Sequence, residues 1–278
     1  MVRPVAVVPL LAALLLAFIG LAAATATRAG RAAAKPIAAA PLAAPRAAPR
    51  ARTLQSLGTV GSGRPAATTP ARPASRPPSF ELLRVRGGRA IHLRARPGGR
   101  VVATVAPRTA FGSPATLSVV ARRGHWVGVP SSALPNGKLG WIDERSPSAS
   151  RGHASVQLVV NLGRRTLELR SQGRVKRTIR VAVGRSGTST PTGRFSVTDK
   201  LSGGQYGPYY GCCVLALSGH QPHPPPGWQG GDRLAIHGTD APGTIGTASS
   251  AGCLRAADSD LRVLMRRVPL GTPVLIRA

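Results

Sequence analysis

Apolar and polar residues alternate over two long stretches of this chain. In residues 80–146, short alternating segments such as Ile91, Leu93 and Ala95 are separated by turns rich in Gly and Pro. A second set of such segments begins at Val156 and continues toward the last residues. Alternation with a period of two is typical of strands that bury one face. The pattern predicts a mostly β chain with two all-β units, joined by a short linker over residues 145–152.

One segment near the C-terminus follows the period of a helix instead. Within residues 258–268 the apolar positions recur at i, i+3, i+4 and i+7, and they are Leu261, Leu264, Met265 and Val268. These positions lie on one face of an α-helix. Asp258 and Asp260 suit the helix N-terminus, where the backbone dipole favours negative charge. We therefore expect one short amphipathic helix in the second unit.

The first 26 residues show neither period. Arg3 precedes an uncharged, largely apolar run from Val5 to Ala26. About 20 such residues suffice to cross a bilayer as a helix, and a basic residue before the run with small residues after it also fits a secretory signal. Residues 1–26 are thus predicted to be a signal peptide or a membrane anchor. Either one places the remainder outside the cytoplasmic membrane, in the cell envelope.

Residues 27–79 consist mainly of Ala, Pro, Arg, Gly, Ser and Thr. Such a composition buries too little apolar area to offset the entropy of ordering, so we expect a disordered linker. The 278-residue chain has a formal charge of +29, from 38 Lys and Arg against 9 Asp and Glu. This charge favours contact with an anionic cell envelope through the linker, or with nucleic acid. Codon usage in a genome rich in G and C explains it equally well.

The stretch from Leu234 to Arg255 adds the most specific chemistry. It contains His237 at the end of a short apolar run and Cys253 directly after a glycine. Cysteine attacks as its thiolate, so it needs a neighbouring base, and an imidazole that titrates near neutral pH suits this role. The separation of 16 residues (253 − 237) is too long for one helix face. It fits a strand, a loop and a segment that returns beside the strand.

The remaining cysteines, Cys212 and Cys213, are adjacent in the sequence. Neighbouring cysteines close only a strained ring, so two free thiols and a bridge are both open. A zinc site is a rival explanation for Cys and His residues. No C-x-x-C or paired-His spacing supplies four ligands, so no metal site is predicted.

Residues 80–146 contain L-R-A-R-P-G-G near their start, and G-H-W-V-G-V and G-W-I near their end. With these motifs the stretch resembles the small Src-homology-3-like β-barrels found beside bacterial cell-wall enzymes. The resemblance implies a wall-binding module. Trp126 and Trp141 would line a ligand groove in it or be buried in the barrel.

Residues 154–278 carry, in this order, T-P-T-G-R-F, I-H-G-T, S-A-G-C-L-R and G-T-P-V. The stretch resembles the L,D-transpeptidase catalytic domain, also called the YkuD domain, which is a β-sandwich. One position departs from the family pattern, because many members have histidine where this chain has Ala251. The departure bears on local contacts with a substrate more than on activity.

The resemblance implies that Cys253 is the nucleophile and His237 the general base. The backbone N–H groups of Gly252 and Cys253 would donate to a developing oxyanion. Gly238 would keep the space beside the imidazole open, and a hydroxyl, that of Thr239 or Ser250, would orient the imidazole. Ser250 also suits a purely structural turn.

Three further side chains are expected to contact a substrate. Arg255 is too strong a cation to act as a base, so it would pair with a carboxylate of the substrate or of the protein. The residues expected to form a wall of the cleft are Tyr210 and His220.

What the resemblance implies is acyl transfer on peptidoglycan. The thiol would attack the carbonyl that links the L-centre of the third stem residue to a D-residue, and an amine from a second stem peptide would resolve the thioester. With water as acceptor the same site would be an L,D-carboxypeptidase. A non-catalytic wall-binding protein and a nucleic-acid-binding protein are the alternatives, but neither unit shows a recognition helix. No metal or organic cofactor is implied.

Overall fold

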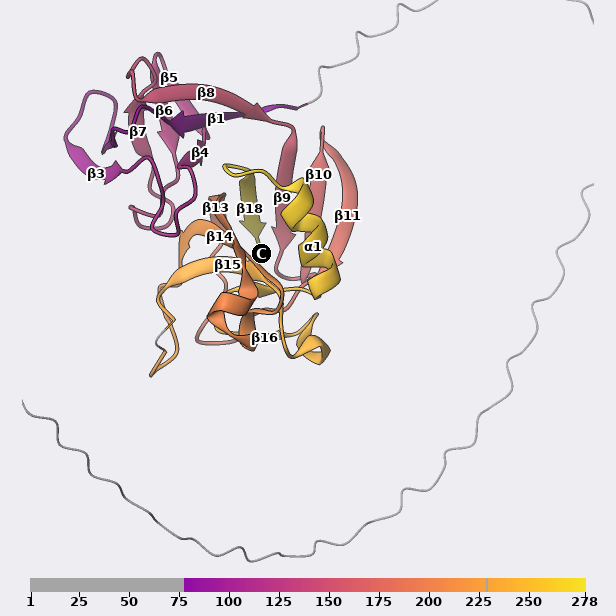
Figure 1. Ribbon diagram of the computed structural model, residues 1–278. Helices are drawn as coiled ribbons and strands as arrows, with labels where there is room; N and C mark the ends of the chain where they lie inside the picture. The colour runs from indigo at the N-terminus through magenta and orange to yellow at the C-terminus, as the bar shows by residue number, and fades with distance from the viewer. Residues whose placement is uncertain (1–77, 229) are drawn as a thin grey trace, which may run out of the picture. The chain divides into compact units, whose positions relative to one another are not determined.

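The computed structural model describes residues 78–278 with the exception of residue 229 (Figure 1). The predicted signal peptide or anchor (1–26) and all but the last two residues of the predicted linker (27–79) lie outside the described residues. Within the described part the chain is mostly β and has one α-helix, as predicted. No helix of this part is both long and apolar enough to cross a bilayer.

The strands from Phe80 to Ala154, which we call the first β unit, form two sheets. The five-stranded sheet has the order β3-β2-β7-β6-β5, with β2 (Ile91–Arg94), β3 (Val101–Val105), β5 (Ala121–Arg123), β6 (Trp126–Val129) and β7 (Gly140–Asp143). The three-stranded sheet has the order β4-β1-β8, with β1 (Phe80–Val85), β4 (Thr116–Ser118) and β8 (Ala149–Ala154). Leu83, Leu93 and Ile142 lie in their shared core. The likeness of this unit to Src-homology-3-like barrels stays a prediction.

The predicted linker over residues 145–152 is wrong in its second half. β8 pairs antiparallel with β1 along its whole length, from Phe80↔Ala154 to Val85↔Ala149. The pairing satisfies backbone N–H and C=O groups that would otherwise remain unpaired at the edge of β1. The polar sequence of β8, A-S-R-G-H-A, gives no apolar alternation from which the strand could be predicted. Only Ser155 separates β8 from the first strand of the second unit.

The second unit is built on an eight-stranded sheet of order β11-β10-β9-β18-β13-β14-β15-β17. Its strands are β9 (Val156–Asn161), β10 (Thr166–Ser171), β11 (Arg174–Arg180), β13 (Gly193–Ser202), β14 (Cys213–His220), β15 (Arg233–His237), β17 (Leu254–Arg255) and β18 (Pro273–Arg277). A second, two-stranded sheet consists of β12 (Val183–Gly184) and β16 (Ala248–Ser250). Single 3-10 turns are η1 (Gly203–Tyr206), η2 (Pro208–Tyr210) and η3 (Pro242–Thr244).

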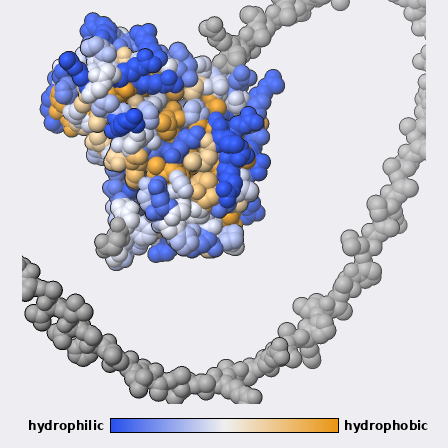
Figure 2. Space-filling model, viewed as in Figure 1, coloured by the Kyte–Doolittle hydropathy of each residue, from blue (hydrophilic) through white to orange (hydrophobic). Residues whose placement is uncertain are grey.

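The helix α1 (Asp258–Arg267) packs against β14. It buries Leu261 and Leu264 and has two aspartates in its first turn, as the sequence pattern predicts. In Figure 2, hydrophilic residues gather over α1 and the strands next to it. The exposed basic residues of α1 and β11 are Arg174, Lys176, Arg177, Arg180, Arg262, Arg266 and Arg267.

Polar side chains join the first β unit to the second. The hydroxyls of Ser118 and Ser196, each at most 1% exposed, lie 2.6 Å apart. Asn136 makes two hydrogen bonds with the backbone of His220: its Nδ2 donates to the carbonyl at 2.7 Å and its Oδ1 accepts from the N–H at 2.9 Å. Because a buried polar atom without a partner costs free energy, these pairs hold the two units in one arrangement.

Candidate functional site

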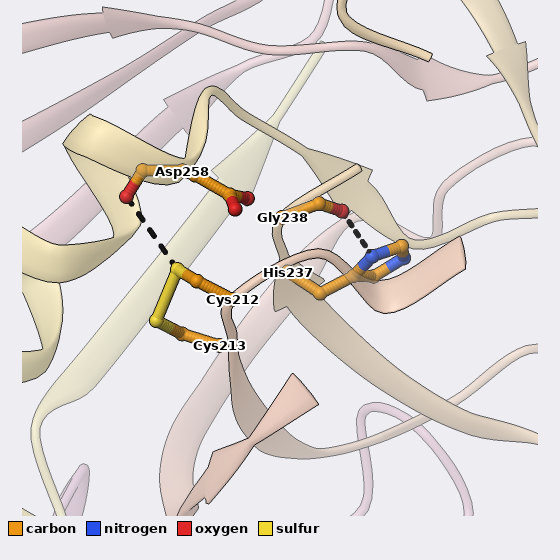
Figure 3. The surroundings of a disulfide bond; sticks show 5 residues. All are labelled: Cys212, Cys213, His237, Gly238 and Asp258. Carbon is orange, nitrogen blue, oxygen red and sulfur yellow. Dashed lines mark hydrogen bonds between the residues drawn. A yellow bond between two sulfur atoms is a disulfide. The ribbon is translucent and has the colours of Figure 1, made fainter. Parts of the chain in front are cut away.

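His237 is the last residue of β15 and is completely buried. Its Nδ1 lies 2.6 Å from the carbonyl oxygen of Gly238, the next residue (Figure 3). A carbonyl oxygen only accepts hydrogen bonds, so Nδ1 carries the proton and Nε2 is the basic nitrogen. The Nε2 atom is buried and has no hydrogen-bond partner among the described residues. Burial lowers the pKa of His237 to about 4, so the imidazole is neutral at neutral pH.

Cys253 directly precedes β17, which runs parallel to β15 with Ile236 opposite Leu254. Its Sγ lies 3.9 Å from the carbonyl oxygen of Arg233. Burial raises the pKa of the Cys253 thiol to about 11. The Ala235 backbone and the Arg255 charge act in the other direction and lower this pKa, but by less than burial raises it. The resting pair is therefore a neutral thiol and a neutral imidazole.

The turn from Ser250 to Cys253 is held by the Ser250 hydroxyl. It donates to the carbonyl oxygen of Cys253 at 2.6 Å and accepts the N–H of Gly252 at 3.1 Å. The N–H of Gly252 is therefore engaged within the turn. The N–H of Cys253 has no backbone or side-chain acceptor within residues 78–228 and 230–278. Of the two backbone N–H groups expected to stabilise an oxyanion, only the N–H of Cys253 has no acceptor among the described residues.

Neither hydroxyl expected to orient the imidazole contacts it. Ser250 serves the turn, and the Thr239 hydroxyl accepts the N–H of Ala241 at 3.0 Å. The carbonyl of Gly238 takes the orienting position instead. A Cβ at Gly238 would overlap the Asp258 carboxylate and approach the Cys212 nitrogen at 2.9 Å, so close packing rather than open space requires this glycine.

Three residues that support the turn carrying Cys253 were not singled out from the sequence. The Gln221 side-chain nitrogen donates to the carbonyl oxygens of Thr188 and Ala251, each at 3.0 Å. The Thr188 hydroxyl donates to the carbonyl of Ser250 at 3.1 Å, and the Thr190 hydroxyl to that of Gly252 at 2.8 Å. Thr190 opens the T-P-T-G-R-F motif, whereas nothing near Gln221 in the sequence indicates its role.

Replacing Gln221 by alanine is expected to slow acylation of Cys253 about tenfold, because it leaves buried carbonyls unpaired at a cost of roughly 1–3 kcal/mol and loosens the turn. The measurement is the rate of covalent labelling by a carbapenem, followed by intact mass. Gln205→Ala is the matched control, since Gln205 is exposed. Equal rates for the two variants would contradict the role assigned to Gln221.

Arg255 is 6% exposed, and its Nη2 donates to the Ser249 hydroxyl at 2.7 Å. Its guanidinium carbon lies 5.9 Å from the centroid of the Tyr209 ring. Its Nε is buried without a hydrogen-bond partner, and no carboxylate forms an ion pair with it among the described residues. A structural carboxylate is thus not found, and pairing with a substrate carboxylate stays a prediction.

Two tyrosine rings cover the imidazole. The ring centroids of Tyr210 and Tyr209 lie 4.9 Å and 5.5 Å from that of His237. The sequence pointed to Tyr210 but not to Tyr209. The structure does not bring His220 to this place, because its Nε2 lies 2.9 Å from the carbonyl of Ser132 and its Nδ1 lies 3.0 Å from Asp232. His220 therefore joins the two units instead of lining the cleft near the thiol.

Cys212 and Cys213, for which the sequence left two states open, form a disulfide beside this site (Figure 3). The carbonyl of Cys213 accepts the N–H of Gly238 at 3.0 Å, and Cys212 Sγ lies 3.5 Å from the carbonyl of Asp258. Cys253 is the free cysteine. The disulfide directly follows Tyr209 and Tyr210 in the chain, and the Cys213 carbonyl binds Gly238, whose own carbonyl orients His237.

Alkylation of the denatured chain without a reductant should add one label, and after reduction three, because only Cys253 is outside the disulfide. Intact mass before and after reduction gives the count. In Cys253→Ala, no label should be added without reductant and two labels should be added after reduction. Three labels without reduction would show that Cys212 and Cys213 are thiols.

Within the described residues, no group of three or more His, Cys, Asp or Glu side chains is arranged to hold a metal ion. The site combines a partly buried thiol, directly before β17, with a buried neutral imidazole at the end of β15.

The sequence profile of the L,D-transpeptidase catalytic domain (YkuD) matches residues 155–276. The putative L,D-transpeptidase YkuD of Bacillus subtilis is 36% identical over 121 residues, which are 43% of this chain and 64% of that protein. The putative L,D-transpeptidase YqjB of Bacillus subtilis is 32% identical over 128 residues, with 43% of this chain and 69% of that protein covered. An L,D-transpeptidase structure from Mycobacterium smegmatis is 16% identical, with a TM-score of 0.37, over 58% of this chain and 82% of that one.

The chain belongs to the L,D-transpeptidase family with a YkuD-type catalytic domain. It spans less than two thirds of the length of YkuD of Bacillus subtilis, and the matched region is confined to the second unit.

Proposed function

We propose that this protein is a peptidoglycan L,D-transpeptidase that links stem peptides through a thioester on Cys253. The observation that supports this most is the bond from His237 Nδ1 to the Gly238 carbonyl. It leaves Nε2 as an unpaired base, on the strand whose backbone contacts the Cys253 thiol.

In the first half-reaction the thiol adds to the carbonyl of the third stem residue as Nε2 takes its proton. The N–H of Cys253 donates to the developing oxyanion. The intermediate collapses with cleavage of the C–N bond, and the imidazolium returns the proton to the leaving amine of the D-residue. The products are a thioester and a free D-amino acid.

In the second half-reaction an amine of another stem peptide attacks the thioester. His237 accepts a proton from this amine and returns it to the departing thiolate. A new amide replaces the one that was cleaved, so no oxidant, metal or organic cofactor enters the balance. Tyr209 and Tyr210 cover the imidazole and limit access of water, which favours an amine over water as the acceptor.

Two further parts of the proposal concern location and contacts. The apolar run from Val5 to Ala26 supports export to the cell envelope. The basic residues of the linker and of the α1 and β11 surface support contact with anionic wall polymers.

The test is incubation of the full chain with purified muropeptides, followed by mass analysis of the products. The wild type should release a D-amino acid and form crosslinked dimers, and Cys253→Ala should form none. Release of the D-amino acid without dimers would identify an L,D-carboxypeptidase. Unchanged muropeptides with both proteins would overturn the proposal and favour a non-catalytic wall-binding protein.

A further inference from the structure

A groove lies between α1 and the strands at one end of the eight-stranded sheet (Figure 1). Its volume is about 460 Å³, within the range of roughly 300–1,000 Å³ that ligand pockets have. We call it the basic groove, and its lining includes Val156, Leu169, Lys176, Arg177, Val263 and Arg267. The strands β9, β10 and β11 form one wall and α1 forms the other. His237 and Cys253 do not line it, because β15 and β17 lie at the opposite end of the strand order.

A β-bulge in β11 directs two neighbouring cations into the basic groove. Consecutive residues of β10 pair with Arg177 and Val175, which leaves Lys176 between them as an extra residue. In a regular strand, neighbours such as Lys176 and Arg177 point to opposite faces. Here both line the groove. The bulge therefore brings two positive charges to this wall where a regular strand brings one.

The helix contributes the other wall with one stripe of its surface. Asp260, Val263 and Arg267 are spaced at i, i+3 and i+7, so they lie on one face of α1. The Asp260 Oδ1 lies 2.7 Å from the Nε and 2.6 Å from the Nη2 of Arg177. This ion pair joins the two walls and leaves the Nη1 of Arg177 without an acceptor among the described residues. Arg267 follows about two helical turns further on and is the third cation of the groove.

The cations of the basic groove have few anionic partners in the protein. Both Lys176 and Arg267 are exposed, and neither forms an ion pair among the described residues. Further exposed arginines on β11 and α1 extend the charge beyond the groove, and they are Arg174, Arg262 and Arg266. Because like charges repel each other, an anion bound here relieves the repulsion among these side chains.

The shape of the groove restricts which anion fits. Its floor is apolar, with Val156, Leu169 and Val263, so the ligand must carry uncharged units between its charges. Its cations stand on both walls, so an anionic group is approached from two sides. A phosphodiester has two charged oxygens on a tetrahedral phosphorus and accepts hydrogen bonds from two directions. The oxygens of a carboxylate lie in one plane and suit a single guanidinium fork.

We propose that the basic groove binds a phosphodiester-linked anionic polymer, with Lys176, Arg177 and Arg267 paired to its phosphates and its uncharged repeat units packed on the apolar floor. This inference rests on the proposed contact with anionic wall polymers and names the place and the charged group of that contact. Because the groove does not include Cys253, a polymer bound there does not compete with a stem peptide for the thiol.

The first test uses the lysines of the full chain, which are Lys35, Lys138, Lys176 and Lys200. An amine-reactive ester labels them, and peptide mass analysis gives the labelling rate of each. Soluble poly(glycerol phosphate) should slow the labelling of Lys176 about fivefold or more, because ion pairing with a phosphate shields the amine. Lys138 is exposed on the first β unit and is the internal control, whose rate should stay unchanged. No slowing at Lys176, or equal slowing at both lysines, would overturn the inference.

Two other probes in the same experiment identify the anionic group and its source. Poly-L-glutamate at the same concentration of charge should protect Lys176 less than poly(glycerol phosphate) does. Equal protection would show that the groove selects charge alone, which overturns the assignment to a phosphodiester. Vesicles of phosphatidylglycerol present the same group on a lipid surface. If they protect Lys176 better than the polymer, the ligand is a membrane and the polymer is the wrong occupant.

The affinity of the full chain for poly(glycerol phosphate) gives a second test. Lys176→Gln/Arg267→Gln should weaken binding about tenfold and lower the slope of log affinity against log salt by about one to two, because each lost phosphate contact releases fewer counterions. Lys138→Gln/Arg100→Gln is the matched control, since it removes the same charges from exposed positions of the first β unit. Equal affinities of the two variants would overturn the groove while the proposed contact with wall polymers stands. Absence of binding by the wild type would count against that contact itself.

Discussion

Replacement of Cys253 by serine is expected to lower the rate of acyl-enzyme formation by about 10⁴-fold or more. The thiol has a pKa of about 11 and the imidazolium a pKa of about 4, so the ion pair is strongly disfavoured in the resting site. The proton must then leave sulfur as the bond to carbon forms. A serine hydroxyl is a weaker acid and a poorer nucleophile than a thiol, and this buried base is too weak to compensate.

The measurement is the rate at which a carbapenem adds its mass to the full chain. Wild type and Cys253→Ser should have the same thermal midpoint within a few degrees, because the two side chains have similar shapes. A decrease of less than tenfold would show that another nucleophile reacts.

Replacement of His237 by glutamine is expected to lower the acylation rate by roughly 10²–10⁴-fold, the usual contribution of a general base. In the wild type the rate should stay high at pH 5 and fall through pH 4, where the imidazole becomes protonated. If the resting site were a thiolate–imidazolium pair, the decrease of the acylation rate at acidic pH would be centred at a pH other than 4. His153→Gln is the control, because His153 is exposed on β8.

The same substitution should change how stability depends on pH. The pKa of His237 is lowered from 6.5 to about 4 in the folded chain. Between these values the unfolded chain binds more protons, so the free energy of unfolding is largest above pH 6.5 and falls as the pH decreases to 4. The loss is about 3 kcal/mol in the wild type and absent in His237→Gln. Denaturant titrations at pH 7 and pH 4 give the difference; equal losses would contradict a buried neutral imidazole.

Periodicity explains what was predictable in the fold. The helix at residues 258–267 has an apolar face of its own, and the strands with one buried face alternate visibly, so both could be predicted from the sequence. β8 could not, because its pairing with β1 depends on backbone groups and not on side chains. The polar segment predicted as a linker is therefore partly a strand, because it pairs with β1 in the folded chain.

The candidate site was predictable only where neighbours in the sequence carry the signal. The segments with His237 and Cys253 were recognisable, and the strand pairing brings them together. Gln221 was not, since it contacts Thr188 and Ala251, about 30 residues away on either side (221 − 188 = 33; 251 − 221 = 30). The orientation of His237 by the Gly238 carbonyl could not be predicted either, because every residue has a backbone carbonyl and the sequence does not mark which one accepts.

The Cys212–Cys213 disulfide determines how Cys253 responds to oxidants. The chain has three cysteines, and two of them are joined to each other. If a peroxide converts Cys253 to a sulfenic acid, no thiol of the same chain remains to resolve it as an internal disulfide. Recovery then depends on a thiol from outside the protein, and without one Cys253 is oxidised further to the sulfinic acid, which thiols do not reduce.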